Sequence, residues 1–278
     1  MDISIDRRRL LLASIALGAA NGGTPAQAAA PGQSSPIHPD LAVKLIIVGR
    51  RRPGTTLAEH RHHIRKVHGE LVLQNIAADP ANAPRRYVQN AVFDGSFRAS
   101  VPGTDPFALN RDFVTQIWVP DLQTLGRARQ SPFYLQKVKH DEDNFVDQAN
   151  VVFMPVRERV VAGTPVPGNQ RVKLFGFVQR AANAAPEDFR RAWGSTAWTT
   201  GGSGPLRHVQ NDTLPTPMGP APLDGIDECW FGDEASAYEF LGRWNAWVND
   251  TLVRPGLAAA GSHFALLARE DVVHAGPQ

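Results

Sequence analysis

Four short segments of the chain have similar counterparts later in the sequence, in the same order, and this internal repeat is the feature that most constrains the fold. The paired segments are residues 43–46 and 172–175, 57–73 and 186–193, 86–90 and 207–211, and 114–118 and 226–230. Four echoes in one order are difficult to explain by chance, and the repeat length is that of a whole domain. We therefore expect two duplicated units, residues 41–160 and 171–272, joined by a linker at residues 161–170.

Each unit is predicted to contain four strands and two helices. The first unit reads as strands at residues 43–48, 86–93, 113–119 and 151–156, with helices at 57–73 and from 121. The order β-α-β-β-α-β is that of a ferredoxin-like unit, and the second unit repeats it. Such a unit has helices on one sheet face only, so the bare face needs a partner. We expect an α+β chain whose two sheets pack face to face around an apolar space, where a small ligand could bind.

The first candidate for chemistry is His68, which lies in the first predicted helix. At 100° per residue it shares a face with Ile64 and Leu71, which is an unusual place for a titratable group. Gly69 follows it and indicates that the helix stops or kinks there. A core histidine with a satisfied hydrogen bond is the alternative. In register with His68 the second unit has Ala197, so only the first unit looks equipped for catalysis.

Side chains on two equivalent strands are predicted to complete the site. Gln116 and Trp118 share one strand face, and Glu228 and Trp230 share the corresponding face in the second unit. If that face lines the cavity, the two indoles can stack on an aromatic ligand. Glu228 could then act as a second catalytic acid or base, with a pKa raised by burial. An outward-facing, solvated glutamate is the alternative.

Tyr87 and Asn90 are further candidates for substrate contacts, but they lie on opposite faces of their strand. The sequence therefore leaves open which of them faces the ligand. The Tyr87 hydroxyl could donate a hydrogen bond to a developing oxyanion, although packing is the commoner use of a tyrosine.

Composition and motifs argue against several other chemistries. A formal net charge of +2 gives no electrostatic case for nucleic acid. Cys229 is the only cysteine, which excludes an intrachain disulfide and cysteine-cluster metal sites. The chain has no phosphate-binding glycine loop and no serine-hydrolase elbow. His60 and His63 could share a metal, but their helix lacks zinc-protease spacing, and we expect a solvated histidine face with no metal and no cofactor.

The first 28 residues read as an export signal. Arg7, Arg8 and Arg9 precede an apolar run that continues through Leu17, and residues 26–28 form a small-residue cleavage pattern. Paired arginines suggest the twin-arginine route to the periplasm, with a Sec signal or an uncleaved anchor as alternatives. Residues 29–40 read as a flexible leader, and we expect no membrane association once the signal has been removed.

Five segments of the chain together resemble the EthD-domain family, namely residues 44–47, 59–61, 67–71, 86–90 and 141–147. The resemblance covers most of residues 41–159 and, weakly, 171–270. It implies a dimeric α/β-barrel fold, shared with small cofactor-free monooxygenases, polyketide cyclases and dehydratases. It also implies that His68 is the motif histidine at the barrel mouth. Family members are often one-unit dimers, whereas this chain looks fused.

These observations predict a cofactor-independent acid/base enzyme of the lyase, dehydratase, isomerase or cyclase type. Its substrate would be a hydrophobic, aromatic small molecule, and His68 would be the general base. Two alternatives stay open, a non-catalytic periplasmic binding protein for a hydrophobic molecule and a cofactor-free monooxygenase of the same barrel type. The sequence does not decide whether two chains associate into a homodimer.

Overall fold

The computed structural model describes residues 39–93, 111–166, 168–169, 171–195, 204–215 and 221–276. The predicted signal at residues 1–28, almost all of the predicted leader, and Ala197 lie outside the described residues. Within the described ranges, no helix has both the length and the apolar character needed to cross a membrane.

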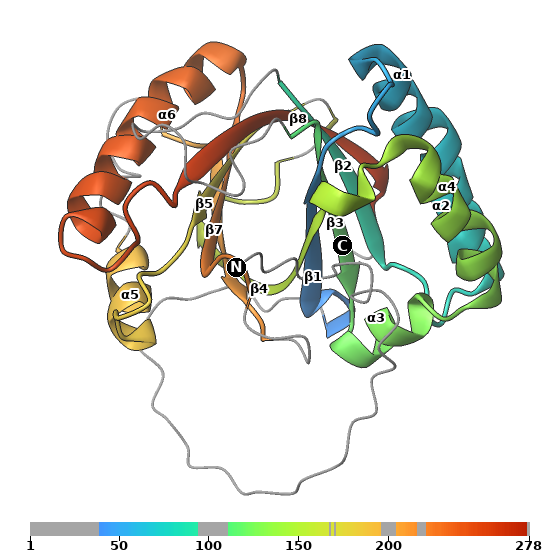
Figure 1. Ribbon diagram of the computed structural model, residues 1–278, viewed down its shortest axis with the longest axis horizontal. Coiled ribbons are helices and arrows are strands. Elements are labelled where there is room, and N and C mark those ends of the chain that lie inside the picture. The colour runs from blue at the N-terminus through green and yellow to red at the C-terminus, as the bar shows by residue number, and fades with distance from the viewer. Residues whose placement is uncertain are drawn as a thin grey trace, which may run out of the picture.

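Eight antiparallel strands close into a single barrel in the order β1-β3-β2-β8-β5-β7-β6-β4 (Figure 1). The strands are β1 (Val43–Gly49), β2 (Arg86–Val92), β3 (Phe113–Val119), β4 (Val152–Ala162), β5 (Val172–Val178), β6 (Arg207–Thr213), β7 (Gly225–Phe231) and β8 (Phe264–His274). The two halves of the chain are joined where β4 pairs with β6 and where β2 pairs with β8. The prediction of an α+β fold is confirmed.

Helices flank the barrel on two opposite sides (Figure 1). In the first half they are α1 (Leu57–His62), the π-helical turn η3 (His63–His68), α2 (Gly69–Ala78), α3 (Leu122–Ala128), the π-helical turn η4 (Tyr134–Val138) and α4 (Lys139–Phe145). In the second half they are α5 (Pro186–Trp193), α6 (Glu234–Val248) and the π-helical turn η7 (Asn249–Val253). Short 3₁₀ turns, η2 (Pro39–Leu41) and η5 (Gln148–Asn150), precede β1 and β4.

Where helices cover the outside, as along β1 and β5, both faces of the barrel wall are largely buried, whereas the second half of β4 is partly exposed. Alternate side chains of β1 show this arrangement: Ile46 packs in an interior cluster with Phe175, whereas Ile47 packs outward against Phe113 and Phe145. At the level of Lys44 the interior is polar instead of apolar, and that side chain is only 1% exposed. The ligand space that the sequence predicts between the sheets is therefore taken up by packed apolar side chains and by a polar cluster.

Candidate functional site

The helix that carries His68 begins as the sequence predicts. The Thr56 hydroxyl accepts a hydrogen bond from the Glu59 backbone amide at 3.2 Å, and the Glu59 carboxylate accepts one from the Thr56 amide at 2.8 Å. This capping box satisfies two backbone donors that the first helical turn leaves free. The helix then widens into the π-helical turn η3, which ends at His68, and it continues as α2.

Of the two predicted outcomes at Gly69, a helix stop or a kink, the stop is wrong. Gly69 has helical dihedral angles, and its amide donates to the Ile64 carbonyl, which is the hydrogen bond of a π turn. The same carbonyl accepts a second hydrogen bond, at 2.6 Å, from Gln89 Nε2 on β2. A Cβ atom at Gly69 would lie 3.4 Å from that nitrogen, so a glycine leaves room for the strand side chain to approach the helix. The π turn therefore depends on a contact made across the packed layers.

His68 is held by a carboxylate from a different helix. Its Nδ1 lies 3.0 Å from Oδ2 of Asp141, in α4, and His63 Nε2 lies 2.7 Å from Oδ1 of the same group. Desolvation opposes ionisation of Asp141, but hydrogen bonds from the two histidines outweigh it and lower the pKa of the carboxyl group. An ionised carboxylate only accepts hydrogen bonds, so Nδ1 of His68 carries the proton. In the neutral ring Nε2 is then an unprotonated base, and it has no hydrogen-bond partner among the described residues.

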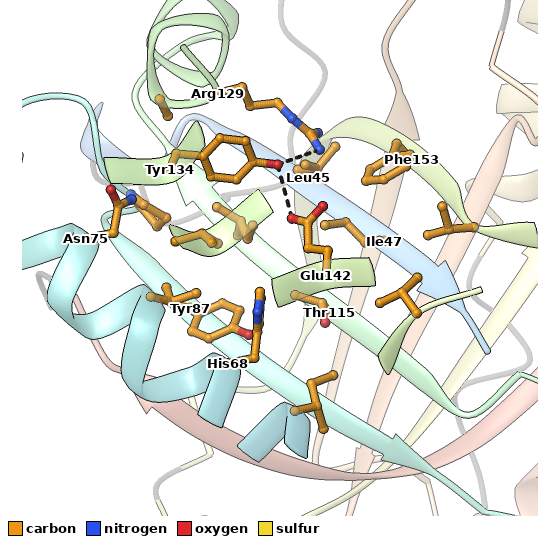
Figure 2. A pocket seen from close by; sticks show the side chains of 18 of the residues that line it. Leu45, Ile47, His68, Asn75, Tyr87, Thr115, Arg129, Tyr134, Glu142 and Phe153 are labelled. Atoms are coloured by element: carbon orange, nitrogen blue, oxygen red, sulfur yellow. Dashed lines mark hydrogen bonds between the residues drawn. The ribbon is translucent and has the colours of Figure 1, made fainter. Parts of the chain in front are cut away.

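The His68 ring lines a cavity of about 90 Å³ between the outer face of β1, β2 and β3 and the helices that cover them; we call it the outer cavity (Figure 2). Most of its wall is apolar, with Leu45, Ile47, Phe113, Phe145 and Phe153 among the lining residues. The Phe145 ring also packs against the imidazole, with the centroids 4.7 Å apart. A mostly apolar cavity with a few polar groups is typical of a site for a small organic molecule.

Other polar side chains reach the outer cavity from several elements, among them β2, η4 and α4 (Figure 2). Tyr87, on β2, accepts a hydrogen bond from Gln89 at 2.8 Å, which leaves its own O–H group free to donate. Burial raises the pKa of Tyr87 far above neutral pH, so the phenol stays protonated. Tyr134 donates to Glu142 at 3.0 Å and accepts from Arg129 at 3.1 Å. Burial raises the pKa of Glu142 and raises that of Tyr134 to about 12.

Glu228 lies inside the barrel and not in the outer cavity. It is 0% exposed, so the alternative of a solvated glutamate is wrong. Its carboxylate accepts hydrogen bonds from Lys44, from Gln116 at 2.8 Å and from Asn211 at 3.0 Å, and Lys173 lies 3.6 Å away. Burial opposes ionisation, but the two ammonium groups and the hydrogen bonds lower the pKa of Glu228 to about 2. A permanently ionised, enclosed carboxylate has no means of exchanging a proton with a ligand in the outer cavity.

The other interior candidates take part in the same polar cluster. The Trp118 indole donates to Glu158 at 3.3 Å and the Trp230 indole donates to Glu270 at 3.1 Å, while a lysine ammonium group lies 4.9 Å and 4.3 Å from the respective ring centroids. The Asn90 amide donates to a backbone carbonyl of β3 and to the Gln116 side chain. These side chains bind one another and are not available to stack on a substrate in the outer cavity.

The structure thus separates the predicted site residues into two groups. His68 and Tyr87 line the outer cavity. The interior group consists of Asn90, Gln116, Trp118, Glu228 and Trp230. Four further polar residues of the outer cavity and its surroundings were not predicted from the sequence, namely Arg129, Tyr134, Asp141 and Glu142, although the acidic stretch at residues 141–147 contributed to the family resemblance. That stretch follows a helical segment and could have pointed to a carboxylate near His68.

In the second half, two bulky side chains pack against the outer face of β5 and β7. The indoles of Trp193 and Trp244 both donate to Asp227 on β7, each at 3.1 Å. Two glycines make room for them, because a Cβ atom would lie 2.3 Å from the Trp244 ring at Gly176 and 2.8 Å from the Trp193 ring at Gly225. The two indoles therefore fill the outer face of β5 and β7, whereas the outer face of β1, β2 and β3 borders a cavity.

The structure offers little support for a metal among the helix histidines. His60 is 1% exposed, so the expected solvated position is wrong; its Nδ1 lies 3.1 Å from the Phe145 carbonyl. His63 Nε2 is hydrogen-bonded to the Asp141 carboxylate. Within the described residues no group of three or more histidine, cysteine and acidic side chains is placed to hold a metal ion.

Comparison with known proteins gives one family match. Residues 52–149 match the family model described as the EthD domain, and this span contains His68 and all the other polar residues of the outer cavity. A search of the curated proteins finds no match. The family match is therefore the comparison that bears on function.

Three of the solved structures that match the chain have low sequence identity to it. An anthrone oxidase-like protein has 11% identity and a TM-score of 0.49, with 84% of this chain and 94% of that chain covered. A protein from Lactobacillus acidophilus NCFM, whose proposed activity is that of a monooxygenase, has 10% identity and a TM-score of 0.44, with 84% and 96% covered. A mutant chlorite dismutase from Candidatus Nitrospira defluvii has 8% identity and a TM-score of 0.43, with 84% and 92% covered.

Proposed function

We propose that the outer cavity, in the half of the chain whose residues 52–149 match the EthD domain model, is the active site of a cofactor-independent acid/base enzyme. Its substrate would be a small, largely apolar and aromatic molecule with an acidic C–H or O–H group. The observation that carries the proposal is the Asp141–His68 pair, which leaves Nε2 of the imidazole unpartnered beside an apolar cavity. Many lyase, isomerase and cyclase reactions begin with such a proton transfer.

The proposed step uses three side chains. Nε2 of His68 removes the proton, and Asp141 stabilises the imidazolium that forms through the Nδ1–H hydrogen bond. The electron pair left on the substrate moves onto a carbonyl or phenol oxygen. The Tyr87 hydroxyl, which is free to donate, stabilises that oxyanion. The apolar wall excludes water and so strengthens both interactions.

We also propose that the chain is a tandem of two ferredoxin-like units that form the barrel within one molecule. The order β4-β1-β3-β2 in one half and β8-β5-β7-β6 in the other supports this interpretation. Under this proposal the first unit, residues 41–160, is the catalytic one. The second unit, residues 171–272, completes the barrel and has its equivalent space filled by indoles.

Proton exchange tests the catalytic proposal without knowledge of the natural substrate. Aromatic ketones and phenols would be incubated with the full chain in deuterium oxide, and exchange of their carbon-bound hydrogens would be followed by NMR. Wild-type protein should accelerate exchange of at least one compound by about 10²–10⁴-fold over buffer, which is the usual contribution of a positioned base. His68→Ala should lose the acceleration, whereas His62→Ala, at an exposed position of the same helix, should keep it.

The same panel separates the alternative functions. Equal exchange by wild type and His68→Ala would exclude the histidine as the base. Tight binding without exchange would indicate a binding protein, and oxygen uptake without added flavin or metal would indicate a monooxygenase. Export by the twin-arginine route stays a proposal that fractionation of cells expressing the full chain would test.

A further inference from the structure

Arg129 places a positive charge at the wall of the outer cavity. It follows α3 directly, and its guanidinium group makes one side-chain hydrogen bond among the described residues, to the Tyr134 hydroxyl at 3.1 Å. The guanidinium also lies 4.9 Å from the centroid of the Phe153 ring and 5.7 Å from that of Tyr134. A guanidinium has five N–H donors, so most of its capacity is unused here.

No carboxylate of the described residues lies within ion-pair distance of this guanidinium. The nearest acidic group in the hydrogen-bond chain is Glu142, which is reached only through the Tyr134 hydroxyl. Glu142 is also the single carboxylate among the described lining residues; burial raises its pKa, while the charge of Arg129 acts in the opposite direction. Among the described residues the half-buried guanidinium therefore has no direct carboxylate partner, although Tyr134 through its hydrogen bond and Glu142 from a distance favour its charged form. Its unused N–H donors are free to bind an anionic group that enters the outer cavity.

The position of Arg129 fits a substrate that spans the outer cavity. Figure 2 shows Arg129 on one side of Glu142 and His68 on the other, with apolar side chains between and around them. A planar guanidinium binds a carboxylate through two parallel hydrogen bonds, which fixes the orientation of the bound molecule. An acid group held at Arg129 would leave the apolar body of the molecule against Phe153 and its reacting atoms toward His68.

We propose that the outer cavity takes an apolar, aromatic carboxylate, and that Arg129 binds its carboxylate group. The inference rests on the proposed function of this same site and narrows its substrate class. It assigns to Arg129 a role in binding and orientation, and the proton transfer remains with His68. The neutral amide of the same acid has the same shape but lacks the charge, so it provides the matched comparison.

The test is isothermal titration calorimetry of the full chain with benzoate, phenylacetate and 3-phenylpropanoate, each compared with its amide. Wild type should bind at least one acid about tenfold or more tightly than the matching amide, as expected for a hydrogen-bonded charge pair. Arg129→Gln should bring the ratio close to one, and Arg129→Lys should keep part of it. Arg127→Gln is the control, because this exposed arginine bonds Asn82 and Thr124 outside the outer cavity and should keep the full ratio.

The proposal is wrong if no acid of the series binds, if acid and amide bind equally, or if Arg129→Gln keeps the wild-type ratio while its circular dichroism shows a folded chain. Should Arg129→Gln fail to fold, Arg129→Lys decides: a full wild-type ratio or its complete loss in a folded chain contradicts a bidentate site. His68→Ala separates the two proposals. It should keep the preference for acids while it loses proton exchange, so a failure of one measurement leaves the other informative.

Discussion

Glu228→Gln tests whether the ion pairs inside the barrel stabilise the folded chain. The substitution keeps the size of the side chain and its contact with Gln116 while it removes the negative charge between Lys44 and Lys173. Each lysine keeps a second carboxylate partner, Glu158 or Glu270, at 2.7 Å. The variant should therefore fold, with a reduced free energy of unfolding.

The magnitude follows from the pKa of the buried carboxyl group. The ordinary glutamate value is 4.5 and the folded value is about 2. At about 1.4 kcal/mol per pKa unit, this difference corresponds to about 3 kcal/mol of stability at neutral pH. Because the folded pKa lies below the unfolded one, this contribution is complete above pH 4.5 and is lost as the pH falls toward 2. By linkage, less than about half of it is left at pH 3.

Urea unfolding at pH 7, 5, 4 and 3 would measure the effect. The difference in free energy of unfolding between wild type and Glu228→Gln should be about 3 kcal/mol at pH 7 and 5 and should shrink at pH 4 and 3. Glu187→Gln, at an exposed position, is the matched control and should change stability by less than about 0.5 kcal/mol. A difference that is the same at pH 7 and pH 3, or close to zero at pH 7, would refute the assignment of a stabilising charge to Glu228.

Three further substitutions test the packing and the site. Gly176→Ala should lower the free energy of unfolding by roughly 2–3 kcal/mol in urea, because the new Cβ atom would lie 2.3 Å from the Trp244 indole. Gly242→Ala is the control in helix α6; its Cβ atom would meet no atom within 4 Å, so it should be neutral or stabilising. Asp141→Asn should lower proton-exchange activity by about 10²-fold or more, measured on the same NMR panel, because the amide no longer fixes the Nδ1–H form of His68. Burial lowers the pKa of His60 in the folded chain, so as the pH drops below 6.5 the unfolded chain takes up a proton at this ring before the folded chain does. The melting temperature should therefore fall with pH in this range, and in His60→Phe this part of the pH dependence should disappear.

Local signals in the sequence predict the elements of this fold well. The β-branched run at residues 43–48 becomes β1, and the pattern of Thr56 and Glu59 forms the capping box that it predicts. These signals act between neighbouring residues, so no tertiary information is needed to read them. The sharing of a helical face with apolar residues points to His68, and both His68 and Ile64 of that face line the outer cavity, whereas Leu71 does not.

Contacts between distant segments explain what the sequence did not reveal. The π turn depends on Gln89, which reaches the Ile64 carbonyl from 25 positions away, and Asp141 reaches His68 from 73 positions away. The faces of the strands were undecidable for a related reason. In a closed barrel with helices outside, both faces are largely buried, so a polar residue such as Glu228 can be enclosed in an ion pair as readily as it can face a ligand.

Closure of the barrel also limits how this protein can associate with others. A strand at the rim of an open sheet carries unpaired backbone amides and carbonyls, to which another chain can add a strand. In this ring each of the eight strands already has a hydrogen-bonded neighbour on both sides. A partner, including a second copy of the chain, therefore has to dock on helices and loops. Aggregation by strand addition at the barrel requires the ring to open first.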